Sequence, residues 1–168
     1  ENEIARFAPA IAEKDVPILT LDRPVGSDAI LRTCLAALAT IPDSQAALYS
    51  RQAVRADWPA GDLRSSAVFN ALPWTSPVVR ITLAKTDLLR AAALLGLVVA
   101  IADGSPDPLT VSTPAYFADQ IAARLDGVRP SIVAPSEFDW FVGRLTADPS
   151  LVRGLPSGWS VVEPGEPQ

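Results

Sequence analysis

Short apolar runs alternate with amphipathic segments between residues 78 and 145, and this is the clearest pattern in the chain. Val78–Leu83 alternates apolar and polar side chains, as a half-buried strand does. Residues 97–102 are apolar throughout, which is typical of a strand covered on both faces. The pattern predicts strands at 78–83, 97–102 and 128–134 and helices at 87–95, 114–125 and 137–145. We therefore expect an α/β fold, a small layered sandwich of alternating strands and helices with an irregular C-terminal tail.

Capping residues favour these helix boundaries. Thr86, Thr113 and Ser136 each directly precede a predicted helix, and their hydroxyl groups can accept hydrogen bonds from its free backbone N–H groups. Pro114 suits the first turn of the middle helix. Gly96 can adopt the left-handed conformation that ends the helix before it.

The first half of the chain has weaker periodicity. Its predicted elements are a short helix at 3–14, a strand at 16–21, a helix at 29–41 and a helical segment at 46–56. Turns rich in proline follow at 58–61 and 72–77, so any domain boundary lies between Trp58 and Pro77. The expected division is an N-terminal α/β segment (1–77), either separate or part of the same domain, an α/β core unit (78–148) and an irregular tail (149–168).

Composition indicates a folded chain with no affinity for nucleic acid. Apolar residues make up 49% of the 168 residues and charged residues 20%, which is enough apolar surface to form a core. The net charge of −5 provides no basic face for a phosphate backbone. The start of the chain is acidic and has no apolar signal-peptide region, and the apolar run at 88–102 is too short to span a bilayer. We expect a soluble, cytoplasmic protein, and the missing initiator methionine suggests a trimmed chain or an excised domain.

The chain contains no histidine and one cysteine, which excludes several kinds of site. Ser-His-Asp and Cys-His catalytic relays and zinc sites of the usual Cys/His type are not possible. Cys34 lies in an apolar helical stretch and is expected to be a buried, unreactive thiol. The glycines form neither a dinucleotide-binding turn nor a phosphate-binding loop. We therefore expect no cofactor, no metal site and no catalytic residues.

Three aspartates leave an enzyme open as an alternative. Asp103 follows a predicted buried strand, where α/β proteins often place their sites, and with Asp107 it could hold Mg²⁺. These residues, and Asp87 in the first turn of a helix, are also ordinary turn and cap residues. A further alternative is a sensor that holds a small ligand against Arg51, Arg55 or Arg80.

The four tryptophans are the candidate partner-binding residues. Trp58, Trp74 and Trp159 lie in segments rich in proline and glycine, and Trp140 lies off the apolar face of its helix. Tryptophan is enriched in protein interfaces, and Arg51 and Arg55 would add orientation.

One family resemblance points in the same direction. An apolar strand ending at Asp103-Gly104, a helix, a strand ending at Pro135-Ser136-Glu137 and a closing helix resemble the N-terminal domain of type II secretion and type IV pilus assembly ATPases. That domain is also fused to some bacterial glycosyltransferases. The Arg-Leu-Gly motif through which some members bind cyclic di-GMP is missing here. The resemblance covers residues 78–145 and implies a non-catalytic adaptor.

The leading hypothesis is thus a non-enzymatic, protein-binding adaptor or regulatory module of a larger bacterial assembly. The alternatives are a small carboxylate-dependent Mg²⁺ enzyme and a small-ligand sensor. The expected partner is another protein and not nucleic acid, and the oligomeric state stays open.

Overall fold

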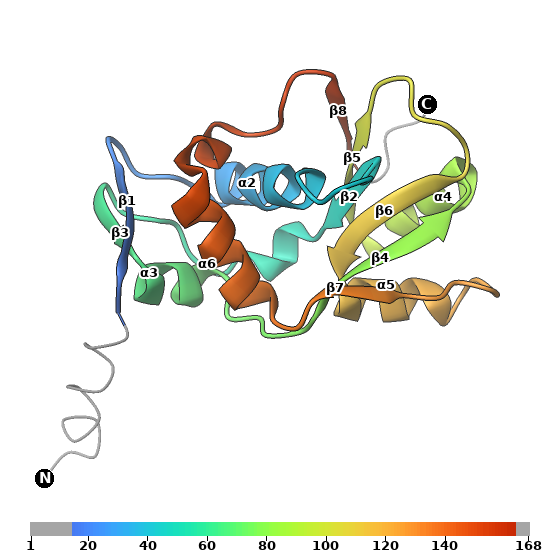
Figure 1. Ribbon diagram of the computed structural model, residues 1–168, viewed down its shortest axis with the longest axis horizontal. Helices are drawn as coiled ribbons and strands as arrows, with labels where there is room; N and C mark the ends of the chain where they lie inside the picture. The colour runs from blue at the N-terminus through green and yellow to red at the C-terminus, as the bar shows by residue number, and fades with distance from the viewer. Residues whose placement is uncertain (1–14, 164–168) are drawn as a thin grey trace, which may run out of the picture.

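The computed structural model describes residues 15–163 and shows a mixed α/β fold (Figure 1). The strands are β1 (Pro17–Leu21), β2 (Ala46–Tyr49), β3 (Gly61–Arg64), β4 (Val78–Leu83), β5 (Val98–Ala102), β6 (Leu109–Pro114), β7 (Ser131–Ala134) and β8 (Trp159–Val162). The helices are α2 (Ser27–Ala39), α3 (Ser65–Ala71), α4 (Lys85–Leu95), α5 (Ala115–Ala122) and α6 (Glu137–Ala147), with 3-10 turns η1 (Arg51–Ala53) and η2 (Pro149–Arg153). The fold class predicted from the sequence is confirmed.

A six-stranded sheet forms the centre of the molecule, in the order β7-β4-β6-β2-β5-β8. β2 and β6 are parallel, and the other neighbouring strands are antiparallel. β1 and β3 form a separate two-stranded antiparallel sheet. Since β2 lies between β5 and β6, the central sheet combines strands from both halves of the chain.

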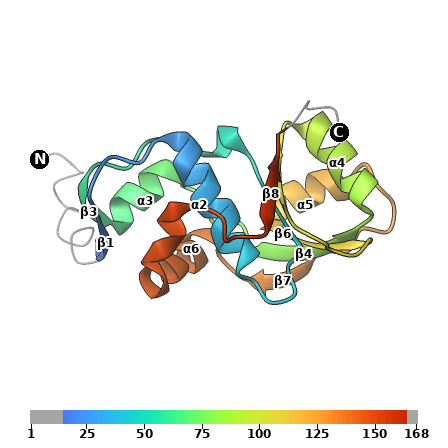
Figure 2. The same cartoon turned by 90° about the horizontal axis from the view of Figure 1, so that it is seen from above.

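Helices cover both faces of the central sheet. Figure 2 shows α2, α3 and α6 on one side of it and α4 and α5 on the other. α2 packs between β2 and α6, and its apolar side chains are buried on both sides. This explains the continuous apolar run at residues 34–39, because the part of a helix that is covered on both sides needs no polar face. The buried residues include Ile30, Leu31, Leu35 and Leu38.

Two local predictions were wrong because tertiary packing overrode local pattern. Residues 46–56 were expected to be helical, but Ala46–Tyr49 is the buried central strand β2 and η1 follows it. A strand buried on both faces loses its polar alternation, so its alanines and leucine resemble a helix. Residues 109–114 form β6, where the sequence indicated only a loop and a helix cap. Pro114 accordingly ends β6 and does not lie in the first turn of α5.

Other boundaries follow the capping signals. Ser136 accepts a hydrogen bond from the Asp139 backbone N–H at 3.3 Å, and Gly96 ends α4 with φ of 65°. Thr86 is not a cap, because α4 already begins at Lys85. Near the C-terminus, β8 pairs with β5 and adds an edge strand within the segment expected to be irregular. The short helix predicted at 3–14 lies outside the described residues.

No helix within residues 15–163 has the length and apolar character required to cross a membrane.

Candidate functional site

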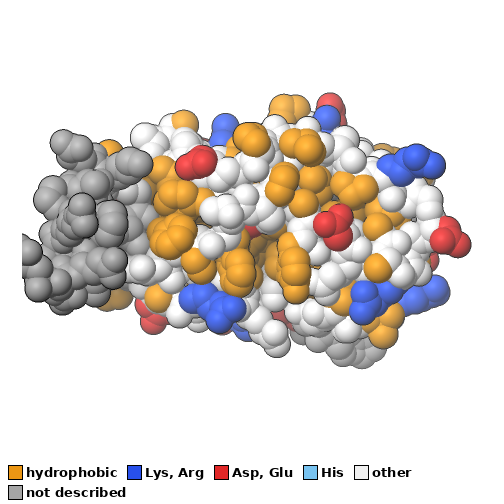
Figure 3. Space-filling view, turned by 90° about the horizontal axis from the view of Figure 1, so that it is seen from below, with side chains coloured by type: hydrophobic (Ala, Val, Ile, Leu, Met, Phe, Trp, Pro, Cys, Tyr) orange, Lys and Arg blue, Asp and Glu red, His pale blue; other side chains and the backbone are white. Residues whose placement is uncertain are grey.

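A cavity of about 360 Å³ opens beside the central sheet, where β2, α5 and α6 begin or end. Figure 3 shows apolar side chains gathered around a hollow on this face of the molecule. Residues from five separate parts of the chain line the cavity: Tyr49, Ser50, Gln52, Ala53, Arg55, Trp74, Ser76, Leu95, Leu97, Pro114, Tyr116, Phe117, Gln120 and Glu137. Its volume lies in the range of small-molecule sites, and its lining mixes aromatic with polar side chains, as such sites do.

Trp74 and Arg55 form one wall of the cavity. Trp74 lies in the segment 72–77, which two prolines keep out of regular structure, as predicted. Its indole Nε1 donates a hydrogen bond to the Ala53 carbonyl at 2.8 Å, which fixes the orientation of the ring. The Arg55 guanidinium lies 5.1 Å from the ring centroid, in cation–π contact. Among residues 15–163, no carboxylate forms an ion pair with Arg55, so its charge is available to a ligand.

Aromatic side chains from β2 and α5 form a second wall. Phe117 packs edge-to-face against Tyr49 at a centroid distance of 5.7 Å and against Tyr116 at 5.5 Å. Tyr116 is 63% exposed at the edge of the cavity, whereas Tyr49 is buried below it. Exposed aromatic faces of this kind bind flat, apolar ring systems.

Glu137 supplies a buried carboxyl group to the cavity. Its side chain is in the first turn of α6, and its Oε1 accepts a hydrogen bond from the Tyr49 hydroxyl at 2.5 Å. The Ser76 hydroxyl donates to Oε2 at 3.4 Å, and the Glu137 backbone N–H donates to the Ser76 carbonyl at 2.8 Å. Burial raises the pKa of Glu137 to about 7, against the lowering effect of these two hydrogen bonds. Burial also raises the pKa values of Tyr49 and of the neighbouring Cys34.

The structure brings together only two of the six candidate partner-binding residues, Trp74 and Arg55. Trp58 is fully buried and packs against Phe141, while Trp140 and Trp159 are half-buried elsewhere. None of these three lines the cavity.

Arg51 is also turned away from the cavity. It forms an ion pair with Asp28 and another with Glu163 at 3.1 Å. Whether any of the six candidate residues binds a protein partner stays a prediction.

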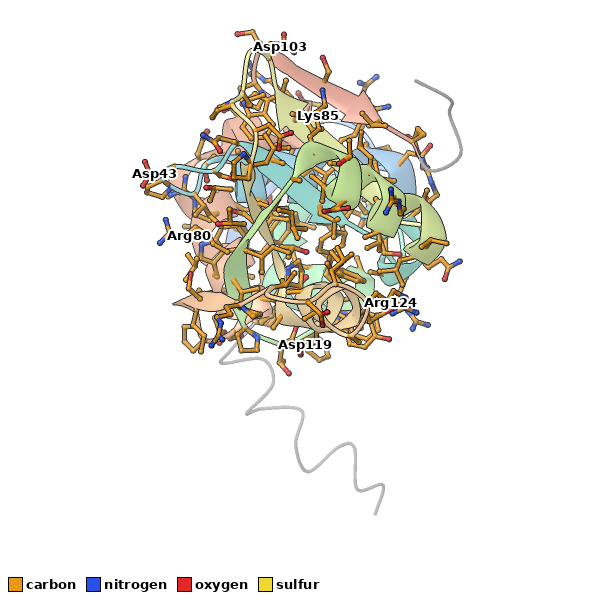
Figure 4. The ribbon with its side chains drawn as sticks, turned by 90° about the vertical axis from the view of Figure 1, so that its right-hand side faces the viewer. Asp43, Arg80, Lys85, Asp103, Asp119 and Arg124 are labelled. Atoms are coloured by element: carbon orange, nitrogen blue, oxygen red, sulfur yellow. The ribbon has the colours of Figure 1, made fainter. Side chains whose placement is uncertain are left out.

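The candidate carboxylates Asp103 and Asp107 lie outside the cavity, and each accepts a hydrogen bond from another part of the chain. Asp103 accepts a hydrogen bond from the Ser160 hydroxyl at 3.0 Å, and Asp107 accepts one from the Lys85 backbone N–H at 2.9 Å. Figure 4 shows Asp103 at an outer edge of the molecule. Within the described range, no group of three or more His, Cys, Asp or Glu side chains could hold a metal ion.

Arg80, a candidate for the sensor alternative, is likewise outside the cavity. It lies 3.9 Å from Asp43, and Figure 4 shows the two side chains on one side of the molecule, pointing outward. Of the three arginines considered for a small ligand, only Arg55 lines the cavity.

Solved structures of known proteins share this fold. No family model and no curated protein matches the sequence. Among solved structures, a 5'-nucleotidase precursor from Thermus thermophilus matches with a TM-score of 0.70 and 13% identity, over 86% of this chain and 39% of that one. The NAD nucleotidase of Haemophilus influenzae matches with a TM-score of 0.63 and 11% identity, over 87% of this chain and 38% of that one. The chain shares its fold with part of each nucleotidase.

These neighbours overturn two expectations from the sequence. The resemblance to the N-terminal domain of secretion and pilus ATPases is wrong, since the structural neighbours are nucleotidases. Its motif required a helix directly after the acidic turn at Asp103, but β6 comes first. The adaptor or regulatory module is also wrong as a functional interpretation, because the neighbours are enzymes, and the enzyme alternative fits better.

Sequence reasoning did not find Tyr49, Tyr116 or Glu137. Tyr49 was assigned to a helical segment, and Glu137 was named only within the Pro135-Ser136-Glu137 segment of the family resemblance, with no role of its own. One signal was present in the sequence. Glu137 precedes Phe141 by four positions and Leu145 by eight, so the three side chains share one face of the helix, and all three are buried. A carboxylate in register with an apolar stripe is expected to be at least partly buried.

Proposed function

We propose that this chain is a nucleotide-binding domain of a nucleotidase-like enzyme. The observation that carries the proposal is the cavity in which Trp74 and Arg55 lie together, in a fold shared with two nucleotidases. The chain corresponds to less than two fifths of each neighbour's length, so the proposal concerns one domain of such an enzyme.

The cavity offers separate contacts to the parts of a nucleotide. Trp74 and Tyr116 provide aromatic faces against which a base can stack. Arg55 provides a positive charge that can bind a phosphate group, since a guanidinium donates two parallel hydrogen bonds to phosphate oxygens. Gln52 and Gln120 add polar contacts at the same cavity. We assign substrate binding and orientation to these residues and place the hydrolytic step in another part of the enzyme.

Binding of nucleoside monophosphates to the purified chain tests this proposal. We expect saturable binding of AMP or GMP by isothermal titration calorimetry, with a change in tryptophan fluorescence. Stacking contributes about 1–3 kcal/mol per base, so Trp74→Ala should weaken binding by about 5- to 150-fold. Arg55→Gln should weaken binding of the monophosphate more than binding of the nucleoside.

Two variants serve as matched controls. Arg51→Gln removes a nearby arginine that lies outside the cavity lining, and Trp159→Ala removes a half-buried tryptophan on β8. Both should bind nucleotides as the unmodified chain does. The proposal is overturned if no nucleoside monophosphate binds at millimolar concentration, or if the control variants weaken binding as much as Trp74→Ala and Arg55→Gln do.

A further inference from the structure

Glu137 is a buried acid without a cationic partner. Only 7% of its surface is exposed, and no arginine or lysine within residues 15–163 forms an ion pair with it. An ionised carboxylate in such a place is costly unless hydrogen bonds satisfy it. The side chain lines the proposed nucleotide cavity and a second cavity of about 10 Å³ behind it. The carboxyl group therefore belongs to the wall that a ligand would meet.

The hydrogen bonds to Glu137 leave some acceptor positions of its carboxylate oxygens unoccupied. The two oxygens of an ionised carboxylate offer about four acceptor positions. The Tyr49 hydroxyl occupies one on Oε1, and the Ser76 hydroxyl approaches one on Oε2 at 3.4 Å. One acceptor position on each oxygen stays available, so the carboxylate can receive two neighbouring donors from a ligand in the cavity.

We propose that Glu137 is the specificity-determining residue of this cavity and accepts hydrogen bonds from the two adjacent N–H donors of a guanine base. This assignment rests on the proposed function. Guanine presents its ring N1–H and its 2-amino group side by side, with the spacing of the two carboxylate oxygens. Adenine presents an acceptor at ring N1, which repels an ionised carboxylate. Tyr49 and Ser76 hold the carboxyl group in position and are positioning residues.

The test compares four nucleotides on the unmodified chain at pH 8, where the carboxyl group is ionised. GMP should bind about 5- to 150-fold more tightly than AMP, because a bidentate pair contributes about 1–3 kcal/mol of discrimination. IMP, which lacks the 2-amino group, should lie between them. The 1-methyl derivative of GMP lacks the N1–H and places a methyl group against the carboxylate, so it should lose the whole advantage. This comparison needs no altered protein and is unaffected by changes in folding.

A substitution then assigns the effect to Glu137. Glu137→Gln keeps an oxygen that can accept from Tyr49, but it places an amide N–H₂ group against the donors of guanine. The ratio of GMP to AMP affinity should fall by about 5- to 150-fold in this variant. Asp139→Asn changes an exposed carboxylate on the same helix, outside the cavity, and should leave the ratio unchanged.

The outcomes separate the two proposals. Nucleotide binding without a preference for GMP, or with the preference retained by 1-methyl-GMP or by Glu137→Gln, overturns the role of Glu137 and leaves the proposed function in place. Failure of every nucleotide to bind overturns the proposed function and the role of Glu137 together.

Discussion

The carboxyl group of Glu137 should make the stability of the chain depend on pH. Burial raises its pKa from 4.5 to about 7, so the folded chain keeps a proton between these values that the unfolded chain releases. The stability from this group is fully present below about pH 4.5 and is lost as the pH rises through about 7. The loss amounts to about 3 kcal/mol, since each pKa unit corresponds to about 1.4 kcal/mol.

Urea unfolding at several pH values checks this first prediction. Glu137→Gln is neutral throughout, so its free energy of unfolding should rise relative to the unmodified chain by about 3 kcal/mol between pH 4.5 and pH 8. The titratable neighbours of Glu137 are Tyr49 on β2 and Cys34 on α2, and both have raised pKa values, so they stay neutral across this range. Parallel stability curves for the two proteins would contradict the prediction.

Residue by residue, the sequence indicated part of the site. Trp74 was a candidate because prolines on either side keep it out of regular structure, and Arg55 was a candidate because, with Arg51, it forms a small basic patch in an acidic chain. The contact between Arg55 and Trp74 at one cavity was not predictable, since 19 positions separate the two residues and their contact depends on how the intervening chain folds. Trp58 shows the opposite case. Its flanking turn resembles that of Trp74, yet its side chain is completely buried.

At the scale of elements, two glycines in helical contexts should respond oppositely to the same substitution. Gly96 ends α4 with φ of 65°, whereas Gly143 lies within α6, and an added Cβ would meet no atom within 4 Å at either position. The difference between them is thus one of backbone conformation. Gly96→Ala should lower the free energy of unfolding by about 1 kcal/mol, because only glycine adopts the left-handed conformation without strain.

Gly143→Ala is the matched control and should raise the free energy of unfolding by about 0.5–1 kcal/mol, since alanine favours a helix interior. Chemical denaturation of both variants measures the two changes in the free energy of unfolding. Equal effects of the same sign would show that the end of α4 does not depend on this backbone conformation.

The elements that the sequence predicted well are those whose local signals agree with their environment. β4 alternates because one face is partly exposed, and α6 has both an apolar stripe and a serine cap. β2 and β6 were missed for a shared reason. Both are central strands, buried on most of their residues, and they pair with strands distant in sequence. Nothing local distinguishes Ala-Ala-Leu-Tyr at such a position from one turn of a buried helix.

At the scale of the molecule, the cavity depends on contacts between both halves of the chain. Its lining comes from residues 49–55, 74–76, 95–97, 114–120 and 137, so it forms only when β2 takes its place between β5 and β6. Periodicity and composition describe single elements and carry no information about such an assembly. This is why the sequence alone predicted the fold class but assigned the wrong function.

The same arrangement predicts where a bound nucleotide should protect the backbone. A ligand present at a hundred times its dissociation constant stabilises the folded chain by about 2.7 kcal/mol. Amides whose exchange requires the cavity to open should therefore exchange up to about 100-fold more slowly. We expect this protection in residues 50–55, 72–77 and 115–120, which surround the cavity.

The sheet formed by β1 and β3 provides the internal control, because none of its residues lines the cavity. Its amides should open locally and exchange at nearly the same rate with and without nucleotide. Hydrogen–deuterium exchange followed by mass spectrometry, with the nucleoside monophosphate that binds most tightly, measures both regions in one experiment. Protection confined to β1 and β3 would place the ligand away from the cavity. Equal slowing of exchange across the chain would show that the ligand acts only on global unfolding. Protection confined to the three cavity segments would locate the nucleotide against Trp74, Arg55 and Tyr116.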